Sequence, residues 1–178
     1  MHHANKSLKH QDGAALVVAL IFLLLMTLLG TSSMRGATMQ ERMSGNMRDY
    51  NLGFQSAEAA LRDGEDFLRN TNVLPDFDDT GGFYIVNSPN RPIWHGDAVT
   101  DGNGYVSYPT DIEGTSERPK YYIERLSTAR PAGTETETGT PTEEIFYFRI
   151  TAIGYGGAQD NAGDSLAAVV LSSVYRSR

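Results

Sequence analysis

The stretch 11-QDGAALVVALIFLLLMTLLG-30 decides how this chain is built. From Ala14 to Leu29 it holds no charged residue, and Thr27 is its only polar side chain. Together with Gly30 and the small polar residues 31–33, the run approaches the roughly 17–25 residues that a helix needs to cross a bilayer. A buried core helix would keep a polar face, and this run has none. We therefore expect a membrane-inserted helix.

Two membrane interpretations are open from the run alone. A secretory signal peptide would have a basic leader, which Lys6 and Lys9 supply, and a small-residue cleavage site, for which 30-GTSS-33 is a candidate. A retained helix is favoured by the residues downstream, since no turn signal comes after Gly30 and a helical pattern continues. The positive-inside count leaves the orientation open, because basic residues lie on both sides of the run.

An amphipathic helix is predicted to continue directly from the apolar run, because no proline occurs before Pro75. From Met43 onward, apolar or small residues recur at alternating steps of four and three, as in a heptad seam. We expect one helix from about Ala14 to about Asn70, with the part of the seam from Tyr50 to Leu68 packed against a globular head. The seam consists of Met43, Met47, Tyr50, Phe54, Ala57, Leu61, Gly64 and Leu68.

The rest of the chain is predicted to form a head with a sheet. Residues 71–120 are rich in Gly, Pro, Asn and Asp, which indicates loops with short extended pieces such as 83–86. Three better strand candidates follow, at 121–126, 145–153 and 166–175. The last is apolar on both faces in its middle, which is typical of a central strand covered by a helix.

Two connections separate these strand candidates. The segment 128-TARPAGTETETGTPTEE-144 is rich in Thr, Pro and acidic residues and predicts a mobile hairpin loop. The segment 154-GYGGAQDNAGD-164 predicts a Gly-rich turn. One long helix followed by an antiparallel sheet gives an α+β fold, in which the helix covers one face of the sheet.

Composition excludes several kinds of function. The 178 residues carry 15 basic and 22 acidic side chains, a net charge of −7, which argues against a nucleic-acid ligand. There is no cysteine, so disulfides and thiolate metal sites are excluded.

No catalytic or metal site is predicted either. After residue 13, His95 is the sole histidine, and no nucleophile or metal-ligand motif surrounds it. The acidic stretches 76-DFDDT-80, 97-DAVTDGN-103 and 160-DNAGD-164 lack the pattern of a Ca²⁺-binding EF-hand loop and predict solvated turns. We expect no enzyme activity, no metal and no cofactor.

A basic leader that ends in glycine, followed directly by an apolar helix that continues as an amphipathic one, resembles a type IV prepilin. The stretches 41-ERMSGNMRDYNLGFQSAEAALRDGE-65 and 147-YFRITAIGYGGAQDNAGDSLAAVVLSSVYRSR-178 are similar to the PilX group of minor pilins. The resemblance covers about half of the chain, and residues 71–143 carry little of it.

The resemblance implies a course of maturation. A prepilin peptidase would cut between Gly13 and Ala14 on the cytoplasmic side, and Ala14 would then be N-methylated. Residues 1–13 would be the leader, 14–33 the membrane and filament-core helix, 34–70 its amphipathic continuation, and 71–178 the head.

The resemblance also implies where the subunit acts. It would sit in the bacterial inner membrane with a periplasmic head, and then in the extracellular pilus, where it would help start assembly and stay near the tip. Implied partners are other minor pilins, a PilY-type tip adhesin, the major pilin and the prepilin peptidase. Twitching motility and cell adhesion are the processes that such pili serve.

This sequence departs from the general pilin pattern at two positions. Ala14 stands where Phe or Met is commoner, and Val18 stands where most pilins have a Glu that is thought to pair with a neighbouring subunit's N-terminal amine. A carboxylate in the membrane costs about 2.5–3.5 kcal/mol on insertion scales, so it persists only where a partner compensates it. The PilX group and the related GspK pseudopilins share this absence, which favours a subunit that initiates or caps a filament. The alternative is that Val18 is simply a lipid-facing residue.

Two other functions remain open. A pseudopilin of a type II secretion system would share the missing Glu, although the GspK pseudopilins usually carry a much larger head. A periplasmic binding module or enzyme on an uncleaved anchor would need a pocket with converging polar groups, and no motif in the sequence indicates one.

Overall fold

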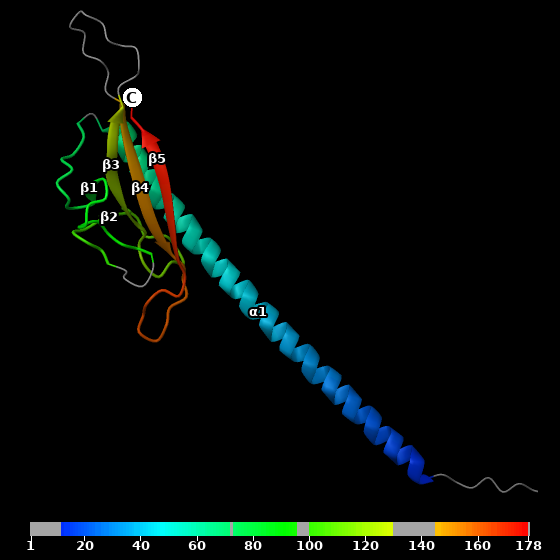
Figure 1. The fold of residues 1–178 in the computed structure, drawn as a ribbon. Helices are drawn as coiled ribbons and strands as arrows, with labels where there is room; N and C mark the ends of the chain where they lie inside the picture. The colour runs from blue at the N-terminus through cyan, green and yellow to red at the C-terminus, as the bar shows by residue number, and fades with distance from the viewer. Residues whose placement is uncertain (1–11, 72, 96–99, 130–144, 178) are drawn as a thin grey trace, which may run out of the picture. The chain divides into compact units, whose positions relative to one another are not determined.

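The computed structural model of this protein describes residues 12–71, 73–95, 100–129 and 145–177. One helix, α1 (Asp12–Asn70), is followed by five strands in the order shown in Figure 1. The strands are β1 (Phe83–Ile85), β2 (Val106–Ser107), β3 (Lys120–Ala129), β4 (Ile145–Tyr155) and β5 (Ala168–Arg176). This confirms the predicted α+β fold. The predicted hairpin loop 128–144 lies outside the described residues from position 130 onward.

The chain divides into two compact units, Met1–Gly45 and Asn46–Arg178. The first contains the N-terminal part of α1, and the second contains the C-terminal part of α1 together with the sheet. The expectation of a helix that continues past Gly30 without a break and ends near Asn70 is confirmed.

The sheet is mixed, where the sequence suggested an antiparallel one. The strand order is β1-β3-β4-β5, and β2 also pairs with β3. The pairs β2–β3, β3–β4 and β4–β5 are antiparallel, whereas β1 runs parallel to β3, with Phe83 opposite Ile123. A parallel pair needs a crossover connection, and the irregular stretch between β1 and β3 supplies it. Turn residues alone do not reveal the direction in which such a stretch returns.

The predicted central position of the last strand is wrong, because β5 lies at the edge of the sheet and β4 lies inside it. On β5, Val169 is buried and Val174 is 60% exposed. On β4, Phe148, Ile150 and Ala152 are fully buried on one face, and Thr151 is buried on the other. The edge strand β5 therefore carries apolar side chains on both of its faces, although α1 covers only one of these faces.

The face of α1 that packs on the sheet differs in part from the predicted seam. Tyr50 and Phe54 are 55% and 42% exposed, whereas Ala57 and Leu68 are buried as expected. Small residues form most of the buried face. Its members are Gly53, Ser56, Ala57, Ala60, Gly64 and Leu68. Large side chains are excluded from this face because the helix backbone comes very close to β4.

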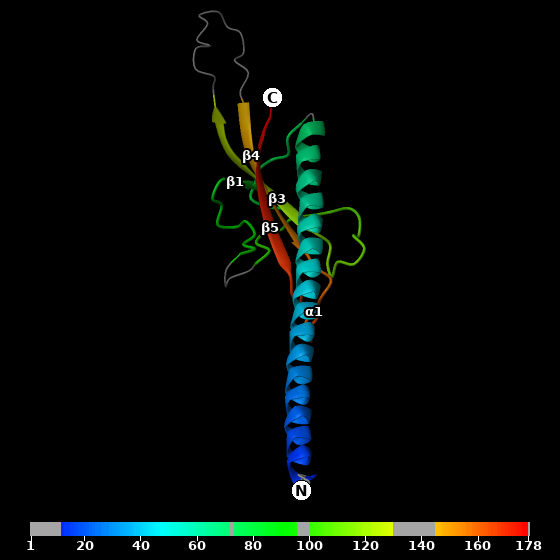
Figure 2. The ribbon, with the colours of Figure 1, turned by 90° about the vertical axis from the view of Figure 1, so that its right-hand side faces the viewer.

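Gly154 on β4 shows how close that approach is. A Cβ atom placed there would lie 2.5 Å from the carbonyl oxygen of Gly53 and nearer still to the backbone nitrogen of Ala57. Beside it, the fully buried hydroxyl of Ser56 donates to the carbonyl of Gly53 at 2.9 Å and lies 3.3 Å from the carbonyl of Tyr155. The predicted turn 154–164 therefore begins inside β4 with Gly154. Because Gly154 has no side chain, the backbone of α1 can pack directly against the strand. Figure 2 shows this part of α1 running alongside the strands.

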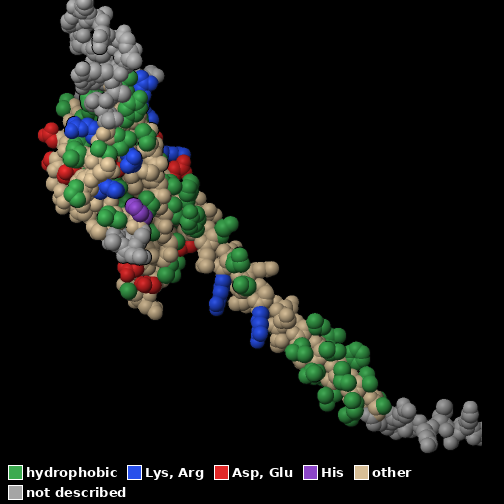
Figure 3. Space-filling view, in the orientation of Figure 1, with side chains coloured by type: hydrophobic (Ala, Val, Ile, Leu, Met, Phe, Trp, Pro, Cys, Tyr) green, Lys and Arg blue, Asp and Glu red, His purple; other side chains and the backbone are tan. Residues whose placement is uncertain are grey.

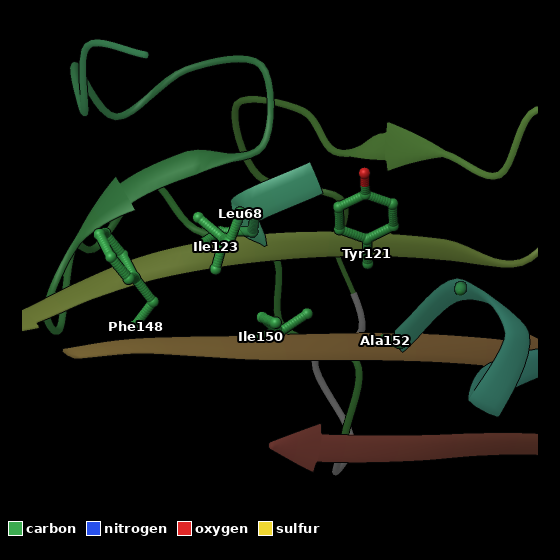
Figure 4. Packing of buried hydrophobic residues seen from close by; sticks show 7 residues of the cluster. Leu68, Tyr121, Ile123, Phe148, Ile150 and Ala152 are labelled. Carbon is green, nitrogen blue, oxygen red and sulfur yellow. The ribbon is translucent and has the colours of Figure 1, made fainter. Parts of the chain in front are cut away.

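The core lies between α1 and the sheet, with a second cluster on the opposite face. Figure 4 shows the first cluster, whose members include Leu68, Tyr121, Ile123, Phe148, Ile150 and Ala152. The second cluster consists of Tyr84, Trp94, Tyr122 and Ile153. The irregular stretch after α1 supplies side chains to both clusters, with Phe77 stacked on Phe148 and Trp94 packed on Tyr122. We call the face opposite α1 the outer face.

Candidate functional site

The N-terminal unit presents an apolar helix surface that nothing in the described structure covers. Between Leu16 and Leu29 every large apolar side chain is 48–69% exposed. The window is apolar enough to cross a membrane, with a mean hydropathy of 2.7. Figure 3 shows hydrophobic side chains around this part of the helix. Exposure of such a surface to water would be strongly unfavourable, so it marks an interaction site.

The polar groups in this segment are satisfied within the helix itself. The hydroxyl of Thr27 donates to the carbonyl of Leu24 at 2.8 Å, and that of Thr31 donates to the carbonyl of Leu28 at 3.0 Å. Backbone groups are paired by the helix. A segment with no unpaired polar group can enter hydrocarbon without an added desolvation cost.

The predicted processing residues lie at the start of this helix. Gly13 and Ala14 are in the first turn of α1, which begins at Asp12. Val18 follows one turn later and is 50% exposed. The next charged side chain along the chain is Arg35, so no carboxylate occurs in the helix between Asp12 and that arginine.

A second exposed apolar strip lies on α1 inside the C-terminal unit. Met47, Tyr50 and Phe54 are 67%, 55% and 42% exposed, and they follow one another at steps of three and four residues. Tyr50 and Phe54 belong to the part of the seam that was predicted to pack on the head, and Met47 precedes that part. Because the small-residue face takes that place, these side chains remain available for contacts outside the chain.

Asp49 fixes the turn between β4 and β5 to the helix. One of its carboxylate oxygens accepts hydrogen bonds from the backbone N–H groups of Gly157 at 2.6 Å and Ala158 at 2.9 Å. A side chain at Gly156 would collide with this carboxylate. This contact was not predicted, although the sequence offered two signals for it, an acidic residue on the helix and the run 154-GYGG-157.

On the outer face, a buried carboxylate is shared by two arginines. Glu124 on β3 is 1% exposed, and its carboxylate lies 3.5 Å from Nε of Arg91 and 3.5 Å from Nη1 of Arg149. The backbone N–H of Asn87 lies 3.4 Å from the same group. This network ties the stretch after β1 to the sheet. This network was not predicted either, although an acidic residue within the strand candidate 121-YYIER-125 was a signal for it.

A shallow cavity of about 310 Å³ lies beside the C-terminal end of α1, and its two carboxylates are already engaged. Asp66 pairs with Arg69 at 2.6 Å. Burial and the neighbouring carboxylate of Asp63 raise the pKa of Tyr121 well above its usual range, and its hydroxyl is hydrogen-bonded to Asp63. We therefore assign no ligand to this cavity.

The other candidate residues do not converge. His95 is exposed beside the buried Trp94. In the described ranges, no group of three or more His, Asp or Glu side chains is arranged to hold a metal ion. Within 160–164, Asp160 accepts the N–H groups of Ala162 and Asp164, which explains this acidic stretch as a turn.

Comparison with known protein families gives two matches. The family described as PilX N-terminal matches residues 12–62. The family described as type IV pilus assembly protein PilX C-term matches residues 49–177, which is more than half of the chain. No curated protein and no solved structure gives a match. Together the two family matches extend from the first turn of α1 to the end of β5.

Proposed function

This chain belongs to the PilX family of type IV pilus assembly proteins, and we propose that it helps to start pilus assembly and stays at or near the filament tip. The observation that carries this proposal is Val18. The exposed apolar surface lacks the carboxylate that most pilins use to pair with a neighbour's N-terminal amine. A subunit without that group has no need to dock beneath an earlier one. The proposed role is structural, as is usual for pilus assembly proteins.

Maturation follows the prepilin scheme in this proposal. Cleavage after Gly13 would free Ala14 as the N-terminus for methylation. The helix would first anchor the subunit in the inner membrane, with the head in the periplasm, and would later enter the filament core. The exposure of every large side chain from Leu16 to Leu29 supports both uses, because lipid and neighbouring apolar helices offer similar surroundings. Other minor pilins, the major pilin and a PilY-type adhesin would be the partners.

Insertion energies make Val18→Glu an informative test. The run contains eleven Leu, Ile, Val and Phe residues, which favour insertion by about 5 kcal/mol in total at roughly 0.3–0.6 kcal/mol each. One added carboxylate costs about 2.5–3.5 kcal/mol. Val18→Glu should therefore still insert and be processed, so any effect on pili reflects docking.

The experiment compares Val18→Glu with Val17→Glu in piliated cells. Both positions are exposed, at 50% and 57%, and both receive the same carboxylate. Mass spectrometry of the mature chain should show methyl-Ala14 in both. Val18→Glu should change the number of pili, or move the subunit from the tip into the shaft as seen by immunogold labelling. Val17→Glu should do neither. Unchanged pilus number and tip labelling in Val18→Glu would refute the argument.

A further inference from the structure

The outer face of the sheet carries an uncovered group of arginines around β4 and β5. Glu124, Arg149 and Val174 lie opposite one another across three strands. Tyr147 and Arg176 form the next row on the same face, because side chains two residues apart in a strand point the same way. Arg91 adjoins the rows from the stretch after β1. We call the set Arg91, Tyr147, Arg149, Val174 and Arg176 the arginine face.

The charges of this face do not balance. Arg91 and Arg149 share the single carboxylate of Glu124, each at 3.5 Å. In the described structure, the Oε2 atom of Glu124, which faces Arg149, has no hydrogen-bond partner, so the guanidinium of Arg149 keeps donors for another acceptor. Arg91 also donates a hydrogen bond to the hydroxyl of Tyr122 at 3.1 Å. Arg176 has no ion pair with a described residue. The three arginines of the set and the carboxylate of Glu124 together carry about two net positive charges, on a protein whose net charge is −7.

The same face is open to solvent. The second core cluster covers the part of this face around Trp94 and Tyr122 and reaches Val170 near the start of β5. Further along the same strands, Val174 is 60% exposed, and the side chain of Arg149 is 41% exposed. Figure 3 shows Lys and Arg side chains spread over this side of the head, with hydrophobic side chains between them. An arginine beside exposed apolar groups is the usual composition of a protein-binding patch.

We propose that the arginine face docks a carboxylate-bearing segment of another pilus-assembly subunit. The inference rests on the proposed function, which supplies neighbouring subunits in the membrane and at the tip. A guanidinium binds a carboxylate through two parallel hydrogen bonds, and Arg149 and Arg176 have donors left for this. Val174 and Tyr147 add apolar contact area. Three arginines on an acidic chain are too few to hold nucleic acid, which needs many phosphate contacts.

The test is site-specific photo-crosslinking in piliated cells that make the full-length protein. A benzophenone amino acid replaces Val174, and a control chain carries it at Val73, which is 83% exposed. The expected result is an adduct at position 174 whose partner peptide, mapped by mass spectrometry, contains Asp or Glu and belongs to another pilus-assembly subunit. An adduct with a second copy of this chain, an adduct with lipid, or no adduct would overturn the proposal.

Arg176→Gln supplies the charge test, with Arg118→Gln as the matched control. Both side chains are exposed, and Arg118 pairs with Asp111 on the loop between β2 and β3. Arg176→Gln should lower the yield of the adduct about fivefold or more, and Arg118→Gln should not change it. Arg176→Glu combined with Lys at the mapped carboxylate should restore the yield. Equal yields in both single variants would overturn the proposal.

Failure of this inference can be told apart from failure of the proposed function. Immunogold labelling in the same cells reports whether the unchanged protein is at the pilus tip. Tip labelling without the charge-dependent adduct refutes only the docking inference. Absence of tip labelling for the unchanged protein refutes the proposed function.

Discussion

Replacing Gly154 by Ala should separate α1 from the sheet. The added Cβ would lie 2.5 Å from the carbonyl oxygen of Gly53 and still closer to the backbone nitrogen of Ala57. Because these atoms belong to the helix backbone, no side-chain rotation relieves the overlap. Ordinary van der Waals contact begins near 3.4 Å, so α1 must move by about 1 Å or more.

The expected cost comes from the contacts that this movement breaks. The contacts of the small-residue face with β4 and β5 are lost together, including the polar contact of Ser56 with the carbonyl of Tyr155. Overpacking a dense core usually costs about 1–3 kcal/mol, and a clash between backbones lies at the upper end, so we expect about 3 kcal/mol. At a urea dependence of about 2 kcal/mol per molar, the unfolding midpoint should fall by about 1.5 M.

The assay is urea unfolding of the full-length chain in detergent, followed by fluorescence. Trp94 is the only tryptophan and is 5% exposed, so its emission reports on the head alone. The control is Gly45→Ala, where an added Cβ meets nothing within 4 Å. That variant should keep the midpoint and raise the helical circular dichroism slightly, since Ala favours a helix by about 1 kcal/mol over Gly. A midpoint shift below about 0.3 M in Gly154→Ala would refute the close-approach argument.

Three further predictions concern the head, each measured by the same unfolding assay. Glu124→Gln should lower the free energy of unfolding by about 2 kcal/mol, because two guanidinium groups lose their shared partner, an effect discounted for their partial exposure; a loss as small as that of Glu113→Gln, an exposed acid, would contradict this. Asp49→Ala should cost about 1–2 kcal/mol by removing the acceptor of two backbone N–H groups, with Asp49→Asn, which keeps an oxygen, costing less. The raised pKa of Tyr121 means that the folded state holds this proton above pH 10, where the unfolded state releases it, so stability should decline as the pH rises beyond 10. Tyr121→Phe should make that decline shallower, and an identical slope would exclude Tyr121 as its source.

Local patterns explain why the elements themselves were predictable. The apolar run and the heptad spacing repeat over many residues, so α1 and its end near Asn70 follow from neighbouring positions alone. The strand candidate 145–153 likewise corresponds to β4, where the alternating residues Phe148, Ile150 and Ala152 are buried on one face. In each case the deciding interactions are between residues close in sequence, or between one side chain and its average surroundings.

The misjudged features all depend on partners far along the chain. Tyr50 and Phe54 fit a heptad seam as well as Ala57 does. Only the close packing of α1 against Gly154 determines that Ala57 is buried and that the two aromatic residues are exposed. The apolar composition of β5 suits a central strand, yet its position at the edge depends on which strand pairs with β4. Glu124 is tolerated in the sheet because Arg91, 33 positions earlier, comes back to meet it.

By itself, the sequence determined a long exposed apolar helix without a carboxylate at Val18, an amphipathic continuation, and a strand-rich head. These properties are local, because the ability of a segment to enter the hydrocarbon of a bilayer depends on the length and apolar character of that segment alone. The tertiary structure alone decided which helix face is free, that the sheet is mixed, and that the arginine face is open. Those outcomes depend on the backbone distances between α1 and β4 and on the strand order. Both are determined only when segments far apart in the sequence pack together.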